Sequence, residues 1–263
     1  MVVTGTMLGF LVWSRVAKNF GVISPYDDET LVFGEFMLNK TKKNLCECDR
    51  VDISVMTRTF ETWSLRGEFL GFETSGKAVD LINTSRLFRY NAYTSIRAAG
   101  LIRVEDVSQR QVLTKPRLLW DFARVSACAR ICSGPRDRAD KGLQPLVHER
   151  TMPPRVMEKF ARMSAIRAVG HVGEDETPRA FTVMACVAAR PNRLLISDPL
   201  FHAHEPQIQP DTEVAVCIIT MDPIAYQVKG VYRGTKFGMG IVEVRECYSA
   251  SPPLLGERID AMP

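Results

Sequence analysis

Residues 31–67 read LVFGEFMLNKTKKNLCECDRVDISVMTRTFETWSLRG, and residues 194–230 read LLISDPLFHAHEPQIQPDTEVAVCIITMDPIAYQVKG. The two stretches align without a gap, each residue of the first lying 163 positions before its counterpart. The match is clearest at 51–55 with 214–218 and at 63–67 with 226–230, where both copies end in a basic residue and a glycine. A period this long excludes a solenoid or a propeller blade, so the pattern predicts a duplicated domain.

Length and composition are those of two small globular domains. The chain has 263 residues, of which 46% are hydrophobic and 24% are charged, close to average globular usage. Together with the repeat, this length predicts two domains, residues 1–145 and 146–263, joined after a linker-like stretch at 133–142. The net charge of +4 is mild, and because no concentrated basic face is evident we expect no nucleic-acid partner.

The cysteines and the amino-terminal apolar run indicate the compartment. Seven cysteines, an odd number scattered along the chain, argue against a disulfide framework and favour a reducing cytoplasm. They lack the paired CxxC spacing of zinc sites, and the four histidines complete no recognisable site, so we expect no metal. The apolar run at 7–13 is too short to span a bilayer, and no signal-peptide pattern is present. We therefore expect a cytoplasmic protein with no membrane partner.

Alternating apolar and polar residues predict a mainly β chain with flanking helices, an α+β protein. In the first half the expected strands are 9–16, 20–24, 29–34, 51–56, 62–70 and 101–107. In the second half they are 165–172, 181–188, 193–197, 214–220, 226–232 and 240–244. The expected helices are 42–48, 86–97, 115–129 and 155–163, with Thr41 as a cap of the first.

The basic segment Lys40, Thr41, Lys42 and Lys43 is the candidate anion-binding site. Turns that hold a phosphate use backbone amides, hydroxyls and cationic side chains together, because a dianion needs several converging donors. This segment supplies one hydroxyl and three ammonium groups within four residues. Three lysines in such a window are also typical of a solvated helix start, so the pattern alone leaves both interpretations open.

The order of elements around this segment resembles the FMN-binding split-barrel family typified by pyridoxamine 5'-phosphate oxidase. The shared order is a strand, a basic turn with a hydroxyl, a short helix, and two strands of which the second ends in a basic residue and a glycine. In the first half the resemblance rests on residues 31–33, 40–45, 51–55 and 63–67, and in the second on 178–181, 193–197, 214–218 and 226–230. The family's oxidase members also place an arginine and a lysine on the strand before the basic turn, where residues 21–26 supply neither.

The resemblance implies tandem split β-barrels that pair within the chain as a pseudo-dimer, with FMN in the groove between them. At the positions that align with Lys40 to Lys43, the second copy has Ala203, His204, Glu205 and Pro206. A glutamate and a proline there remove donors, so the second anion site is expected to be lost. The resemblance therefore implies one good flavin site, with its phosphate on the first copy.

These expectations lead to a flavin-dependent oxidoreductase that acts on an unidentified small molecule. The isoalloxazine ring would carry the redox chemistry, so no catalytic side chain is singled out. The alternatives are a non-catalytic module that binds flavin or haem, and a duplicated barrel that has lost its cofactor. A deazaflavin in place of FMN and a further homo-oligomer also stay open. His202 and His204 are interpreted first as polar residues of a turn, because no carboxylate or cysteine has suitable spacing for a shared metal.

Overall fold

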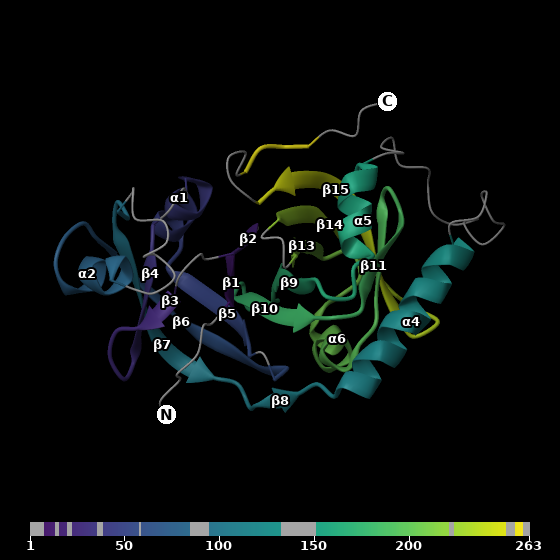
Figure 1. Cartoon of the computed structure of the whole chain (residues 1–263), viewed down its shortest axis with the longest axis horizontal. Coiled ribbons are helices and arrows are strands. Elements are labelled where there is room, and N and C mark those ends of the chain that lie inside the picture. The colour runs from purple at the N-terminus through teal and green to yellow at the C-terminus, as the bar shows by residue number, and fades with distance from the viewer. Residues whose placement is uncertain are drawn as a thin grey trace. The chain divides into compact units, whose positions relative to one another are not determined.

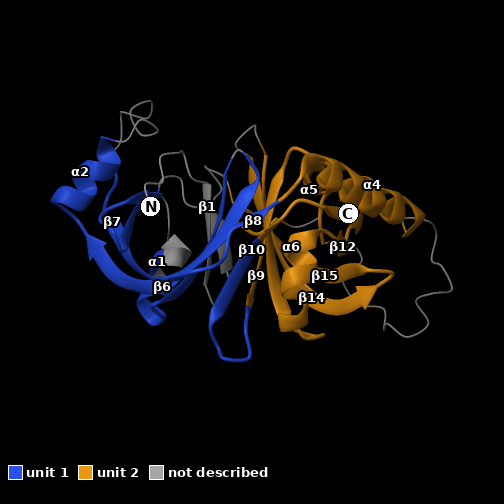
Figure 2. Ribbon diagram, turned by 90° about the horizontal axis from the view of Figure 1, so that it is seen from below, with its two compact units in different colours: residues 1–112, 172–181 blue, residues 113–171, 182–263 orange. Residues whose placement is uncertain are grey.

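The computed structural model describes residues 8–13, 16–19, 23–35, 39–57, 59–84, 95–132, 151–220, 224–250 and 256–259 (Figure 1). The chain divides into two compact units, coloured in Figure 2. Unit 1 comprises residues 1–112 and 172–181, and unit 2 comprises residues 113–171 and 182–263. The domain boundary predicted near residue 145 lies outside the described residues.

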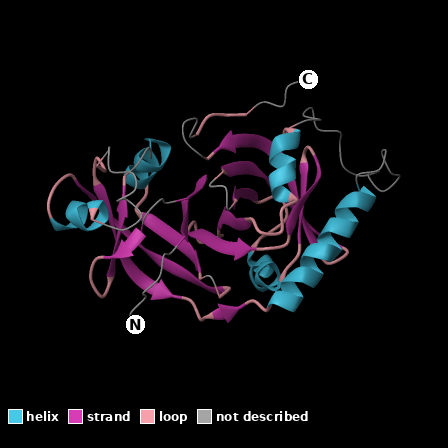
Figure 3. Ribbon diagram, viewed as in Figure 1, coloured by secondary structure: helices cyan, strands magenta, loops and turns pink. Residues whose placement is uncertain are grey.

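The architecture is mainly β with flanking helices, which confirms the predicted fold class (Figure 3). The strands of the first sheet lie in the order β2-β1-β5-β6-β7-β4-β3, and β8 pairs with β6. The bounds of these strands are β1 Leu8–Trp13, β2 Val16–Asn19, β3 Ile23–Pro25, β4 Thr30–Gly34, β5 Arg50–Met56, β6 Glu61–Glu73, β7 Ala99–Val107 and β8 Gln111–Val112.

The second sheet has the order β10-β9-β13-β14-β15-β12-β11. Its strands are β9 Ile166–Val172, β10 Pro178–Val183, β11 Cys186–Arg190, β12 Arg193–Ile196, β13 Glu213–Ile219, β14 Ala225–Lys236 and β15 Met239–Ser249. Strand β10 crosses the division of the chain, since residues up to Phe181 belong to unit 1 and those from Thr182 to unit 2.

The two sheets correspond strand by strand. Their orders become the same when every strand number of the β1–β7 path is raised by eight. The register corresponds as well, because Val51 pairs with Gly67 between β5 and β6, and Val214 pairs with Gly230 between β13 and β14. At these glycines an added Cβ would lie 2.0 Å and 2.1 Å, respectively, from a carbonyl oxygen of the neighbouring strand. Such close backbone approach requires glycine, which explains why both stretches have one at this place.

The helices agree only partly with the sequence predictions. They are α1 Asn39–Glu47, α2 Lys77–Asn83, α4 Lys115–Cys132, α5 Pro154–Phe160 and α6 Pro199–His204, followed by the 3₁₀ helix η2 Glu205–Gln207. The sequence did not predict α2, α6 or η2. The helix predicted at 86–97 falls mostly outside the described residues, and its described end, 95–97, is not helical. No helix in the described part of the chain has the length and apolar content needed to cross a membrane.

Each unit has its own apolar core. In unit 1, Phe33 of β4 lies against Phe69 and Phe72 of β6, with ring centroids 6.2 Å and 5.9 Å away. In unit 2, helix α4 packs on β11 and β12, with Val125 and Ala129 buried at the contact. Burial of these faces follows from the alternation of the strands and from the apolar side of the helix.

Candidate functional site

The predicted anion-binding residues lie at the start of helix α1. The helix begins at Asn39, so Thr41 lies inside it and the prediction of Thr41 as the cap was wrong. A cap residue has non-helical backbone angles, so a residue inside the helix such as Thr41 cannot be the cap. Lysine is a good helix former, so Lys40 extends the helix toward its amino-terminal end. The first turn contains no acidic residue, so the helix dipole and the lysine charges both favour an anion there. The side chains of Lys40, Thr41 and Lys43 lie outside the described part of the structure.

Lys42 already has a carboxylate partner. Its Nζ donates to both carboxylate oxygens of Glu35, at 3.1 Å and 3.2 Å, and lies 5.0 Å from the centroid of the Phe72 ring. Glu35 is 7% exposed, and the Lys42 side chain keeps 46% of its surface in contact with solvent. A phosphate at α1 would therefore share Lys42 with a fixed carboxylate. The predicted site depends more on Lys40 and Lys43 than on Lys42.

The aligned segment of the second half has the opposite charge. Ala203 and His204 end α6, and Glu205 and Pro206 begin η2. The Glu205 carboxylate accepts hydrogen bonds from Thr235 Oγ1 and, at 3.3 Å, from the Tyr232 hydroxyl. The bond from Thr235 is the main reason why the pKa of Glu205 is lowered. A carboxylate thus lies at the position that Lys42 occupies in the first half.

Asp198 organises the start of α6 in the second half. Its carboxylate accepts the backbone N–H groups of Phe201 at 2.9 Å, Met184 at 2.6 Å and Ala185 at 3.1 Å. Burial raises the pKa of Asp198, although these three N–H groups favour the charged form. Asp198 is aligned with Glu35, so one half uses this position to cap a helix and the other uses it to hold a lysine.

Arg167 of β9 is the largest fully buried side chain among the described residues. Its guanidinium donates to four backbone carbonyl oxygens, at 2.6 to 2.9 Å, those of Phe160, Arg162, Ala165 and Met184. Burial lowers the pKa of Arg167 to about 10, so the side chain stays charged at neutral pH. The role of this arginine is to join the end of α5 to β9 and to the segment before β11.

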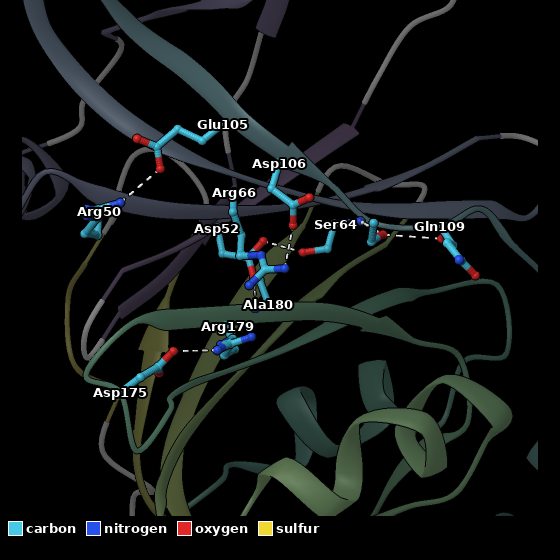
Figure 4. A network of polar contacts seen from close by, with 11 residues as sticks. Arg50, Asp52, Ser64, Arg66, Glu105, Asp106, Gln109, Asp175, Arg179 and Ala180 are labelled. Carbon is cyan, nitrogen blue, oxygen red and sulfur yellow. Dashed lines mark hydrogen bonds and ion pairs between the residues drawn. The ribbon is translucent and has the colours of Figure 1, made fainter.

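A second polar network lies within unit 1 and is centred on Asp52 of β5 (Figure 4). Asp52 is 2% exposed; it accepts a hydrogen bond from the Ser64 hydroxyl of β6 and one, at 2.9 Å, from the Ala180 N–H of β10. Two arginines interact with its charge, Arg66 and Arg179. Each arginine also has an outer carboxylate: Arg66 lies 2.5 Å from Asp106, and Arg179 lies 2.6 Å from Asp175.

Burial sets the protonation of Asp52. It raises the pKa of Asp52 to about 6, against the lowering effect of Ser64, the Ala180 N–H and the two arginines. A buried carboxyl with a raised pKa is a candidate acid or base, although structural networks show the same property. Sequence reasoning missed Asp52, and the only available signal was a charged residue between the apolar residues Val51 and Ile53 of a predicted strand.

The histidines of α6 have local partners. His202 Nε2 lies 3.2 Å from Ser197 Oγ, and His202 Nδ1 lies 3.6 Å from a Glu205 carboxylate oxygen. Ser197 is fully buried, accepts from Arg124 and donates to the Gly238 carbonyl oxygen at 3.0 Å. This arrangement ties α6 to α4 and to the β14–β15 turn. Within the described ranges, no group of three or more histidine, cysteine, aspartate or glutamate side chains could hold a metal ion.

Comparison with known proteins gives partial likenesses only. No family model and no curated protein matches the chain. HupZ of Group A Streptococcus is 16% identical, with a TM-score of 0.33, over 38% of this chain and 82% of HupZ. An FMN-binding protein from Syntrophomonas wolfei is 12% identical, with a TM-score of 0.33, over 41% of this chain and 78% of that protein. An F420 reductase is 14% identical, with a TM-score of 0.31, over 39% of this chain and 90% of the reductase. Likenesses at this level assign no ligand or activity to the chain.

Proposed function

We propose that the chain is a duplicated split barrel that binds one FMN, with the phosphate at the first turns of α1, and acts as a flavin-dependent oxidoreductase on a small molecule. The proposal rests on two sheets that have the same strand order and the same register between matching strands. In the first sheet β4 is followed by α1, which carries basic residues at its start, whereas in the second sheet β12 is followed by α6, which does not. The difference in charge between two otherwise matching segments supports the proposal that one copy retains an anion site.

The proposed phosphate site combines backbone and side-chain donors. The N–H groups of the first turn of a helix have no partner within the helix, and they favour an anion. Lys40 and Lys43 would add charge, and Thr41 would add a hydroxyl. The flavin would supply the redox chemistry when bound, whereas the chain's residues would bind it, orient it and exclude water.

The proposal extends to the arrangement of the two copies. The copies, residues 1–145 and 146–263, would pair within the chain in the way that two subunits pair in the family that the sequence resembles. The sequence difference at α1 and α6 then predicts one FMN per chain.

The Lys42–Glu35 pair favours one alternative function. Because the Glu35 carboxylate already accepts from Lys42 Nζ, this lysine has an anionic partner without a ligand. A duplicated barrel without cofactor, which would act by contacts with other molecules, is consistent with this pair.

Titration with FMN tests the proposal. The full chain should take up one FMN, and the Lys40→Ala/Lys43→Ala variant should bind it at least about tenfold more weakly, since each charge-assisted hydrogen bond to phosphate contributes on the order of 1.5–3 kcal/mol. The Lys115→Ala/Lys159→Ala variant removes the same charge elsewhere and should bind like the wild type.

The outcomes distinguish the alternatives. No uptake at 1 mM FMN, a concentration of about ten times a weak cofactor Kd, would favour the barrel without cofactor. Equal affinity in the Lys40/Lys43 variant would place the phosphate elsewhere. Bound flavin that is bleached by a reduced nicotinamide would support the oxidoreductase, whereas flavin that no nicotinamide reduces would favour a non-catalytic binding module.

A further inference from the structure

Helix α4, Lys115–Cys132, has a mostly apolar set of residues on its exposed side. Seven exposed residues share a roughly 120° arc of the helix, at about 100° per residue; they are Pro116, Leu119, Trp120, Ala123, Ala127, Arg130 and Ile131. Leu119 is 53% exposed, Trp120 67% and Ile131 73%. The outer side of a surface helix normally carries charged and polar residues, whereas Arg130 is the one charged member of this set.

We propose that this set, the α4 face, is the surface through which two copies of the chain associate, by antiparallel packing of α4 on the partner's α4. In a two-fold pair centred near residue 125, Leu119 would face the partner's Ile131, and Ala123 would face the partner's Ala127. Large apolar residues then meet at both ends, and small residues at the centre let the helices approach closely.

The single charge of the α4 face, on Arg130, favours the same antiparallel arrangement. In the antiparallel pair the Trp120 ring faces the partner's Arg130, which places a guanidinium against an indole. In a parallel pair Arg130 would face the partner's Arg130, and the two like charges would repel. A single cation on an apolar surface also makes a poor site for a nucleic acid or a strongly acidic protein, since both need several charges. A second copy of the chain would bury the apolar residues and would also provide an aromatic partner, Trp120, for Arg130.

The β14–β15 turn lies beside α4 within unit 2. Phe237 at the turn is 83% exposed. The neighbouring Gly238 lies close to α4, since a Cβ added there would be 3.5 Å from Arg124 Nη1. The Gly238 carbonyl and Arg124 also share Ser197 Oγ as a hydrogen-bonding partner. The turn is thereby held beside Arg124 in the middle of α4, and Lys236 Nζ lies 5.6 Å from the centroid of the Phe237 ring.

The size of this surface implies a weak dimer. Two helices and two flanking turns bury on the order of 1,000 Å² in total, the lower limit for specific association. We therefore expect a Kd of roughly 10 μM. The association needs no flavin, so it stands or falls separately from the proposed cofactor.

Sedimentation velocity of the full chain from about 1 to 300 μM, a range that brackets the expected Kd, tests the proposal. The wild type should shift from monomer to dimer. Ala127→Glu places an unpaired charge at the centre of the contact and should raise the Kd at least about tenfold. Because Ala127 is exposed, the monomer should keep its circular dichroism spectrum and unfolding midpoint. Met163→Glu makes the same charge change at a 49% exposed apolar residue outside α4 and should leave the Kd unchanged.

A charge-swap variant tests the register. Ala123→Glu alone should weaken the dimer as Ala127→Glu does. Ala123→Glu combined with Ala127→Lys should restore the Kd to within about threefold of the wild type, because the antiparallel pair sets each glutamate opposite the partner's lysine. A wild type that stays monomeric at 300 μM, a dimer that Ala127→Glu leaves intact, or a double variant without rescue would each overturn the proposal.

Discussion

Replacing Asp52 by asparagine should change how the stability of the protein depends on pH. Asp52 is buried, and its pKa is raised to about 6 from an ordinary value of 3.8. Asparagine has nearly the same shape, can accept the Ala180 N–H through Oδ1 and can bond to Ser64 Oγ through Nδ2. The variant therefore removes the titration while it keeps both contacts.

The size of the effect follows from linkage. Between pH 3.8 and about 6 the folded state binds the Asp52 proton more tightly than the unfolded state does. The stability contributed by this proton is fully present below the unfolded pKa and is lost as pH rises through the folded pKa. A shift of this size corresponds to about 3 kcal/mol, of which about 2 kcal/mol should be lost between pH 4 and pH 7.

Urea unfolding of wild type and Asp52→Asn at several pH values from 4 to 7 provides the measurement. The free energy of unfolding of the wild type, minus that of the variant, should fall by about 2 kcal/mol across this range. Asp106→Asn is the control, because it removes an exposed carboxylate of the same network and should keep the slope of the wild type. Parallel curves for wild type and Asp52→Asn would refute the reasoning, since they would mean that Asp52 does not titrate in this range.

Further substitutions test the other contacts by urea unfolding or ligand titration. Arg167→Met leaves buried carbonyl oxygens without a donor and should lower the free energy of unfolding by about 3 kcal/mol or more; a loss under 1 kcal/mol would contradict the role given to the guanidinium. Gly67→Ala and Gly230→Ala each drive a Cβ into a carbonyl oxygen and should each cost about 2 kcal/mol or more, so a variant as stable as the wild type would show that the strands can separate there. Glu35→Gln frees Lys42 and should tighten binding of inorganic phosphate or FMN about threefold, which isothermal titration can detect; weaker binding would mean that Glu35 positions Lys42 for the ligand.

Much of the fold could be predicted because it depends on local pattern. Alternation of apolar and polar residues predicted most strands of both halves, although the single strand predicted at 181–188 is two strands, β10 and β11. Strands β5 and β13 lie at the same offset as the two sequence stretches. The helices were harder to predict, since a short helix gains most of its stability from packing. The start of α1 was misplaced by three residues for this reason: the lysines looked like a turn, but they continue a helix that begins at Asn39.

The candidate site was predictable only as a charge pattern. The four residues from Lys40 to Lys43 are neighbours in the sequence, so their shared position could be inferred directly. The partner of Lys42 could not, because Glu35 lies in the preceding loop, outside the three- or four-residue spacing of helical ion pairs.

By itself the sequence determined the β class, the repeat and the one basic segment, because alternation and alignment are properties of neighbouring residues and of a constant offset. Only the tertiary structure decided what Asp52 and Arg167 do. Asp52 meets the Ala180 N–H across 128 positions of chain, and Arg167 gathers carbonyl oxygens from three separate segments. Such contacts depend on how buried backbone groups find partners after the strands have assembled, and no local pattern in the sequence records that.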